Sequence, residues 1–175
     1  SESPEDRRVV MFLGNTFGNL RSETAFVEHT LGRLLRRGDV LWLEVGVRQD
    51  RIEDDGLYAL AQGALGDTQE TVRRSLVEGP HRRFRTSVGS SSETSMQVIP
   101  RDGGATCEIP RSYNFVHDVD VNPSGQRCSV LYSRRYDIPA LRSWLAGRGY
   151  ETLLEHRVKD SGGRDRTAHL LLRST

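Results

Sequence analysis

The segment that decides the fold is VVMFLGNTFGNL, residues 9–20. It begins with five consecutive apolar residues, 9–13, a pattern typical of a β-strand that is covered on both faces, as the strands of parallel sheets are. A polar stretch comes next, in which two glycines and two asparagines predict a loop over residues 14–19. We therefore expect a parallel α/β sheet whose first strand lies near the start of this chain.

The residues after this loop predict a helix and a second strand. Ser22 is a candidate N-cap, and apolar residues recur at helical spacing over residues 26–35. The triplet RRG at 36–38 is typical of a helix C-terminus, with two cations in the last turn followed by glycine. Residues 40–47 are again mostly apolar, so residues 1–50 predict a β-α-β core with two parallel strands.

The middle of the chain, residues 51–127, has a different pattern. Apolar spacing between residues 52 and 77 predicts two helices. Between residues 83 and 111 the period shifts toward two, which favours short antiparallel strands. Residues 112–125 have no clear period and end in a turn signal, so they are expected to form a loop. Together these patterns indicate a helical and β insertion.

The last part, residues 128–175, predicts a strand, a helix and a hairpin. A strand candidate at 128–136 precedes Asp137, which can cap the next helix. Residues 152–158 and 167–173 are two strand-like runs joined by a glycine-containing turn. They predict a terminal β-hairpin.

The composition fits one globular domain and excludes several functional classes. Hydrophobic residues make up 35% of the 175 residues, and no stretch approaches the roughly 18 apolar residues that cross a membrane. Cys107 and Cys128 favour reduced thiols and a cytoplasmic location over a disulfide scaffold, and a disulfide between these two is the alternative. The 25 basic residues are interleaved with 24 acidic ones, which argues against nucleic-acid binding. No metal-ligand spacing is present, so no metal site is predicted.

Four segments, in order, resemble the histidine-specific methyltransferase family, which includes the enzyme that trimethylates histidine in ergothioneine biosynthesis. VVMFLGNTFGNL is similar to that family's FLGSTIGNL segment, and LRRGDVLWLEVGVRQD to its fifth strand and the residues after that strand. LYSRRYDIPALRSWLAGRGYE is similar to its ENSYKYT segment and the helix after it, and TAHLLL to its last strand.

This resemblance lies within the C-terminal half of the family. It implies the second half of a class I, Rossmann-like methyltransferase fold, with strands four to seven, an inserted antiparallel β element and a terminal β-hairpin. Residues 1–175 then form a single partial methyltransferase-like domain. The glycine-rich loop that cradles S-adenosylmethionine has no counterpart here, because no G-x-G-x-x-G comes after a strand.

The resemblance also implies substrate contacts. Asn19 matches the asparagine that holds the amino-acid substrate, since an amide can donate to a carboxylate and accept from an ammonium group. Tyr58, Ser133 and Tyr136 match further substrate contacts of the family. Each has a structural alternative: a loop or cap residue for Asn19, a helix-face aromatic for Tyr58, and strand packing for Ser133 and Tyr136.

Three other positions bear on the cofactor and the substrate. Gly14 and Gly18 suit a loop whose backbone closely approaches a ligand, here the cofactor, although close packing against a neighbouring element requires glycine equally well. Leu131 stands where the family has a glutamate, which argues against histidine itself as the substrate. No catalytic residue is assigned, because methyl transfer to an amine depends mainly on positioning.

The sequence therefore predicts part of an S-adenosylmethionine-dependent methyltransferase that acts on the amine of a small amino-acid-like substrate, the chain alone being inactive. Its partner is then the missing N-terminal half or a second copy. The alternative is a non-catalytic binding or assembly module that is derived from the same fold and completes its sheet with a partner strand. A distinct small α/β protein that shares only the pattern is the third possibility.

Overall fold

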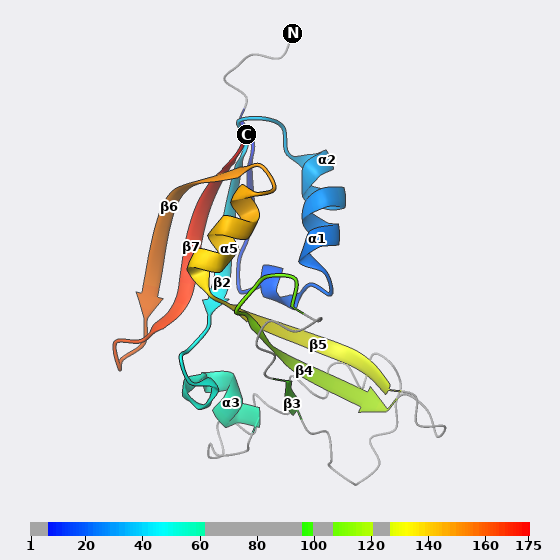
Figure 1. The fold of residues 1–175 in the computed structure, drawn as a ribbon, viewed down its shortest axis with the longest axis vertical. Coiled ribbons are helices and arrows are strands. Elements are labelled where there is room, and N and C mark those ends of the chain that lie inside the picture. Colours follow the sequence, from blue (N-terminus) through cyan, green and yellow to red (C-terminus); the bar gives the residue numbers. More distant parts are fainter. Residues whose placement is uncertain (1–6, 62–95, 100–106, 121–126) are drawn as a thin grey trace. The chain divides into compact units, whose positions relative to one another are not determined.

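The computed structural model describes residues 7–61, 96–99, 107–120 and 127–175 (Figure 1). The chain divides into two compact units. Unit 1 consists of Ser1–Arg48, Arg101–Tyr113 and Arg134–Thr175, and unit 2 consists of Gln49–Pro100 and Asn114–Ser133. Helices and strands occur in both, so the fold class is mixed α/β, as the sequence predicts.

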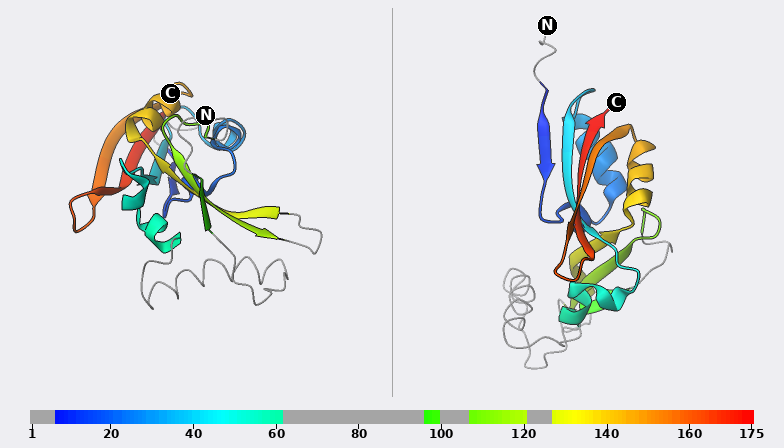
Figure 2. Two further views of the ribbon diagram at one scale, coloured as in Figure 1. Left: turned by 60° about the horizontal axis from the view of Figure 1, so that its bottom comes forward. Right: turned by 90° about the vertical axis from the view of Figure 1, so that its left-hand side faces the viewer.

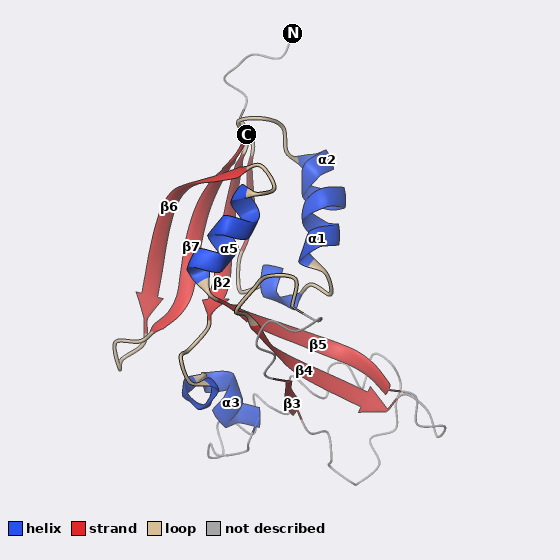
Figure 3. Ribbon diagram, viewed as in Figure 1, coloured by secondary structure: helices blue, strands red, loops and turns tan. Residues whose placement is uncertain are grey.

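Unit 1 combines a sheet with two helical segments (Figure 3). Its strands are β1 (Val9–Phe12), β2 (Val40–Val47), β6 (Tyr150–Lys159), β7 (Asp165–Ser174) and residues 134–136 of β5 (Arg127–Tyr136). The first helical segment consists of α1 (Glu23–Ala25), η2 (Phe26–Leu31) and α2 (Gly32–Leu34), and the second is α5 (Ile138–Ala146). A short 3-10 turn, η1 (Phe17–Asn19), comes before the first segment.

The opening strand lies in a parallel pair. β1 pairs with β2 in parallel, with a register that runs from Val9 opposite Val40 to Phe12 opposite Leu43. The end of β5 also pairs with β2 in parallel, further along at Gly46. β7 takes the other edge of β2 in antiparallel orientation, so β1 and the end of β5 share one edge. The predicted parallel β-α-β arrangement is confirmed.

The chain closes with the predicted hairpin. β6 and β7 pair in antiparallel orientation from Tyr150 opposite Ser174 to Lys159 opposite Asp165, with register shifts near both ends of β6. Within unit 1 the strand order is therefore β1, β2, β7 and β6. The terminal β-hairpin at residues 152–158 and 167–173 is confirmed.

The two faces of this sheet differ. Leu41, Leu43, Leu170 and Leu172 point to one face, which we call the inner face, and all four are fully buried. They belong to one apolar core with residues of both helical segments, so these segments cover the same face (Figure 2). The core consists of Phe17, Val27, Leu31, Leu35, Leu41, Leu43, Val45, Val47, Ile109, Tyr136, Ile138, Leu141, Leu145, Tyr150, Ala168, Leu170 and Leu172.

The opposite face, which we call the outer face, carries exposed apolar side chains. Met11 is paired with Trp42, which is paired with Leu171, which is paired with Leu154, so these four side chains form an apolar row across the sheet. Met11 is 55% exposed and Leu154 is 58% exposed. The prediction that the opening strand is covered on both faces is therefore wrong, because the helical segments of unit 1 pack on the inner face only.

The first helical segment begins as predicted but ends earlier. Ser22 is its N-cap, and its hydroxyl accepts a hydrogen bond from the backbone N–H of Ala25 at 3.1 Å. η2, in the middle, is a π-helical turn. The last helical residue is Leu34, whereas the sequence predicts an end at residues 36–38. The reason is the Asp39 carboxylate, which accepts the Arg36 N–H at 2.9 Å and holds these residues in a turn.

The second helix, α5, has its predicted start. The Asp137 side chain accepts a hydrogen bond from the Ala140 N–H at 3.0 Å, which is the N-cap interaction that the sequence predicts. Leu141 and Leu145, one turn apart, are fully buried in the core. The cap and the apolar stripe together fix where the helix begins and which side faces the sheet.

Unit 2 holds most of the residues between β2 and β5. Its elements are η3 (Ile52–Asp54), α3 (Gly56–Ala61), β3 (Met96–Ile99), most of β4 (Tyr113–Asp120) and the beginning of β5. β3 pairs with β4 in antiparallel orientation, which confirms an antiparallel β element in this part of the chain. The predicted helix after residue 66 and the predicted strand at 84–88 lie outside the described residues.

The predicted loop at residues 112–125 is wrong at β4. Residues 113–120 have the sequence YNFVHDVD, in which apolar and polar side chains do not alternate strictly. Asparagine and aspartate weaken the strand signal further, because they are depleted in strands and favoured in turns. Pairing with β3 provides the backbone hydrogen bonds that low strand propensity does not predict.

Candidate functional site

The candidate site is the loop at the carboxyl end of β1, residues 13–20, which we call the β1 loop. In open α/β sheets, ligands bind beyond the carboxyl ends of parallel strands, where the loops after these strands meet. β1 and β2 are parallel, so the β1 loop lies at that end of the sheet. It carries three of the predicted site residues, namely Gly14, Gly18 and Asn19.

Gly14, the second residue of the β1 loop, has a backbone conformation that favours glycine. Its φ is +66°, in the left-handed region, and a Cβ atom built there would meet nothing within 4 Å. Its backbone N–H donates a hydrogen bond to Glu44 Oε2 at 3.0 Å, which ties the loop to β2. The open space beside Gly14 is compatible with the predicted cofactor contact, although its own N–H is already used by Glu44.

Asn15, which was not predicted as a site residue, holds the β1 loop to two strands. Its side-chain Oδ1 accepts the Gly46 N–H at 2.9 Å, and its Nδ2 donates to the Arg134 carbonyl at 3.4 Å. Its φ of +59° is unusual for a residue with a side chain but common for asparagine. The Gly-Asn pair directly after a predicted strand is the feature of the sequence that could have identified Asn15.

Gly18 is required by packing within the protein. A Cβ atom at this position would lie 2.5 Å from Asn15 Oδ1 and 2.9 Å from the Arg134 carbonyl oxygen. The second contact is with backbone, which cannot move aside as the end of a flexible side chain can. The sequence offers two explanations for Gly18, approach to a ligand and close packing against a neighbouring element. The structure supports the second explanation.

Asn19 is an exposed polar residue of the β1 loop. It is the last residue of η1, and its backbone N–H donates to the Thr16 carbonyl at 3.2 Å. Among the described residues, none forms a hydrogen bond with its side-chain amide. Its donor and acceptor are therefore available to a small polar ligand.

Tyr136 lies below the β1 loop, in the core. Its side chain is fully buried, and its hydroxyl lies 2.8 Å from Glu23 Oε1 and 3.4 Å from the Phe17 carbonyl oxygen. Burial raises the pKa of its phenol far above the ordinary value, while the nearby Arg134 opposes the shift. Tyr136 is consequently a neutral donor engaged inside the protein, which matches the packing alternative, and its predicted substrate contact stays a prediction.

Tyr58 and Ser133, the other two predicted substrate contacts, belong to unit 2. Tyr58 is half-buried in α3, where its N–H donates to the Asp55 carbonyl at 2.9 Å. Ser133 is buried in β5. Unit 1 therefore brings together Gly14, Gly18 and Asn19 above Tyr136, and the roles of Tyr58 and Ser133 remain predictions.

The start of α1, beside the β1 loop, is fixed by Glu108, a residue that no pattern in the sequence singles out. The Ser22 hydroxyl donates to Glu108 Oε1 and the Thr24 N–H donates to Oε2, each at 2.6 Å. Partial burial alone would raise the pKa of Glu108, but these hydrogen bonds lower it below its usual range. No local pattern links residues so far apart in sequence.

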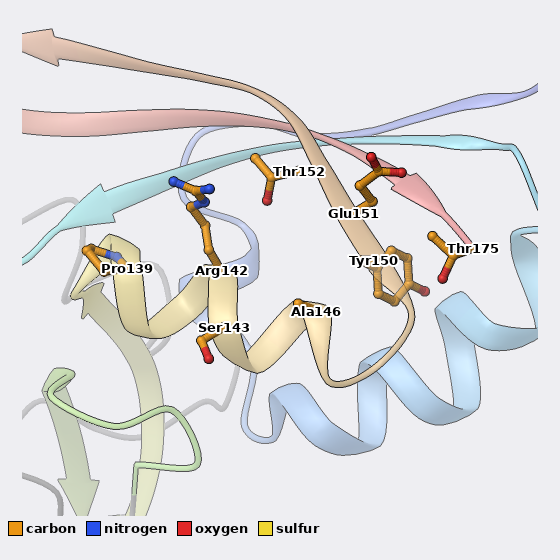
Figure 4. A pocket seen from close by; sticks show the side chains of 8 residues that line it. All are labelled: Pro139, Arg142, Ser143, Ala146, Tyr150, Glu151, Thr152 and Thr175. Atoms are coloured by element: carbon orange, nitrogen blue, oxygen red, sulfur yellow. The ribbon is translucent and has the colours of Figure 1, made fainter.

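A separate open pocket lies between α5 and β6 (Figure 4). Its charged groups are already paired, because Arg142 contacts Glu155 at 3.0 Å and Glu151 contacts Arg173. None of the predicted site residues lines it. The pocket is lined by Pro139, Arg142, Ser143, Ala146, Tyr150, Glu151, Thr152 and Thr175.

Over the described part of the chain, no three His, Cys, Asp or Glu side chains are grouped so that they could hold a metal ion. No helix among the same residues has the length and apolar character needed to span a bilayer. No protein-family model matches the sequence, and a search of the curated proteins found no match either.

Proposed function

We propose that this chain is part of an S-adenosylmethionine-dependent methyltransferase that acts on the amine of a small amino-acid-like substrate. The observation that carries the proposal is the β1 loop, which presents the Asn19 amide at the carboxyl end of a parallel strand pair. The loop sequence is also the segment with the most specific resemblance to the histidine-specific methyltransferases.

The arrangement of unit 1 supports the same proposal. The second half of the class I methyltransferase fold is expected to contain a parallel strand pair joined by a helical segment, followed by a helix and an antiparallel final hairpin. Unit 1 has β1 and β2 in parallel, then α5, then the β6–β7 hairpin. The agreement concerns the order and direction of these elements.

The chemistry requires little from this chain besides positioning. When bound, S-adenosylmethionine supplies an electrophilic methyl group. The protein has to hold a neutral amine in line with that group and to exclude competing orientations. The exposed amide of Asn19 would bind the substrate carboxylate or ammonium group, while Asn15 and Glu44 keep the loop in place.

The residues present fit the substrate side of such a site better than the cofactor side. Gly14 leaves open space beside the loop, but a single exposed glycine does not replace the missing glycine-rich segment. We therefore expect the 175-residue chain to bind S-adenosylmethionine only when the first half of the fold is supplied.

A first test combines the reading frame with a binding measurement. The frame upstream of Ser1 is expected to encode a strand followed by a glycine-rich loop. The complete protein should bind S-adenosylmethionine in calorimetric titration and methylate one member of a panel of amino acids and small amines. A complete protein that binds no S-adenosylmethionine would contradict the proposal, and so would tight binding by the 175-residue chain alone.

A second test addresses Asn19. In the complete protein, Asn19→Ala should raise the KM for the amine substrate about 10- to 100-fold, because a well-placed polar contact to a charged group contributes about 1.5–3 kcal/mol. Arg21→Ala, a change two residues further along the chain, serves as the matched control and should leave KM unchanged. An Asn19→Ala protein with the same KM as the wild type would remove Asn19 from the site.

A second candidate function is an assembly module without catalysis. The observation that favours it is the free edge of β1, which pairs only with β2 among the described residues and carries the exposed side chains Val9 and Met11. Unpaired apolar edges promote association with another strand. If the natural protein lacks an upstream half, sedimentation should find a dimer, and S-adenosylmethionine should not bind.

A further inference from the structure

A buried polar network lies directly beneath the β1 loop. It joins Glu23, the first residue of α1, to Arg134 and Tyr136 near the end of β5. Their exposed fractions are 0%, 2% and 0%, respectively. The Arg134 guanidinium contacts Glu23 Oε1, and the Tyr136 hydroxyl donates to the same oxygen at 2.8 Å.

Such a network is an unusual way to fill a core. Removing two charges from water costs several kcal/mol per ion, and replacing a buried ion pair with apolar side chains of similar size is often neutral or stabilising. Burial lowers the pKa of the Arg134 guanidinium and raises the pKa of the Tyr136 phenol, so the surroundings disfavour charge on both groups. A gain in stability is therefore a poor explanation for the network.

The same end of β5 fixes the β1 loop through its backbone. The Arg134 carbonyl accepts from Asn15 Nδ2 at 3.4 Å, and it lies so close to Gly18 that no Cβ atom fits there. The Tyr136 ring packs against Phe17 with a centroid distance of 5.9 Å, and its hydroxyl lies 3.4 Å from the Phe17 carbonyl. Backbone and side-chain contacts of residues 134–136 thus converge on the β1 loop.

We propose that the Glu23–Arg134–Tyr136 network is a positioning device that sets the β1 loop, and with it Asn19, against the end of β2. Its three side chains are buried, whereas Asn19 is exposed. The hydrogen bond and the ion pair between α1 and β5 are directional, so they fix the loop in one position. Apolar side chains of the same volume would not do this, because their contacts are not directional. The benefit to ligand binding rests on the function proposed above, but the positioning itself does not.

The test is amide hydrogen exchange of the 175-residue chain, measured residue by residue by NMR. The Asn19 and Leu20 N–H groups, which donate to Thr16 and Phe17, report on the β1 loop. Amides of β7, such as that of Leu170, report on the whole unit. Tyr136→Phe removes one hydroxyl and should accelerate exchange at Asn19 and Leu20 about five- to tenfold, with β7 unchanged.

A double variant separates positioning from stability. Glu23→Leu combined with Arg134→Met removes both charges without leaving one unpaired, so its Tm should be equal to or above that of the wild type. Its loop amides should nevertheless exchange about tenfold faster. Glu155→Leu combined with Arg142→Met, which removes an ion pair between α5 and β6, is the matched control and should leave the loop amides unchanged.

Two results would overturn the proposal. One is unchanged exchange at Asn19 and Leu20 in both network variants. The other is an equal acceleration at the loop and at β7, which would make the network a purely structural feature. If the double variant does not fold, Tyr136→Phe alone decides by the same comparison. Neither variant is tested with cofactor or substrate, so a failure of the methyltransferase proposal would leave this result intact.

Discussion

The inner and outer faces of the unit 1 sheet are made from the same strands but have opposite surroundings. Leu41 and Leu43 of β2 are fully buried, whereas Trp42 between them is 37% exposed. Strand alternation places them on opposite sides, and the described helices of unit 1 pack on the inner side. An apolar residue in this sheet is therefore part of the core when its side chain is on the inner face, and is exposed at the surface when its side chain is on the outer face.

The largest expected difference between the faces comes from truncating neighbouring leucines of β7. Leu170 is fully buried on the inner face, and Leu171 belongs to the outer face. Leu170→Ala should lower the free energy of unfolding by about 2–5 kcal/mol, through lost burial and the cavity left behind. Leu171→Ala should cost less than about 1.5 kcal/mol. Urea denaturation measures both, and equal losses would show that the outer face is covered in solution.

Asp39, directly before β2, lies at the end of the sheet and belongs to neither face. The Asp39 carboxylate accepts the N–H groups of Arg36 and Arg8 and pairs with the Arg8 guanidinium at 2.9 Å. The hydrogen bond from Arg36 and then that from Arg8 lower its pKa. Because the folded pKa lies below the unfolded value of about 3.9, the stabilisation is complete above that pH and is lost as the pH falls through the folded pKa.

Urea titrations from about pH 7 down to about pH 3 measure this effect. Asp39→Asn should be less stable than the wild type at neutral pH, and the difference should shrink as the pH falls below about 4. Asp50→Asn, at an exposed position, is the control and should show no such convergence. A difference that stays constant over the whole range would mean that Asp39 acts through its shape and not through its charge.

The smallest effect on stability is expected on the outer face of β1. Met11→Glu should change the free energy of unfolding by less than about 0.5 kcal/mol, because the side chain is already in water. Val10→Glu, one residue earlier and packed against the core, should be clearly destabilising. If a second copy covers the outer face, Met11→Glu will also weaken association in sedimentation velocity, which would assign the two faces different roles.

The sequence predicts much of the fold because the relevant signals are local. Residues 9–13 and 40–47 are apolar runs of strand length, Ser22 and Asp137 are recognisable caps, and the terminal hairpin has a glycine-containing turn. The missed features depend on distant residues. The helix ends at Leu34 because Asp39 and Arg8 hold the next residues, and β4 forms because β3 pairs with it.

The candidate site shows the same division. Gly14 and Asn19 stand out in the sequence because a loop with glycine and asparagine comes after an apolar strand. The contact of Glu23 with Tyr136 joins residues that are 113 positions apart, and an arginine in a strand gives no sign that its side chain is buried. Pairing of buried charges depends on tertiary packing, which no short pattern encodes.

The π-helical turn η2 has a consequence for how this protein tolerates changes in length. A π turn holds one more residue than an α turn, and η2 stands between Glu23 and the short helix α2. Deleting one residue there would let the segment relax to ordinary α-helical geometry with its two ends in nearly the same relative orientation, because an α-helix turns more per residue than a π turn. Glu23 would still face Arg134, whereas the same deletion in an ordinary helix would rotate one end by about 100°. The wide turn thus accommodates one residue more while an acidic group at the start of the segment and apolar groups further along face the same side of the sheet.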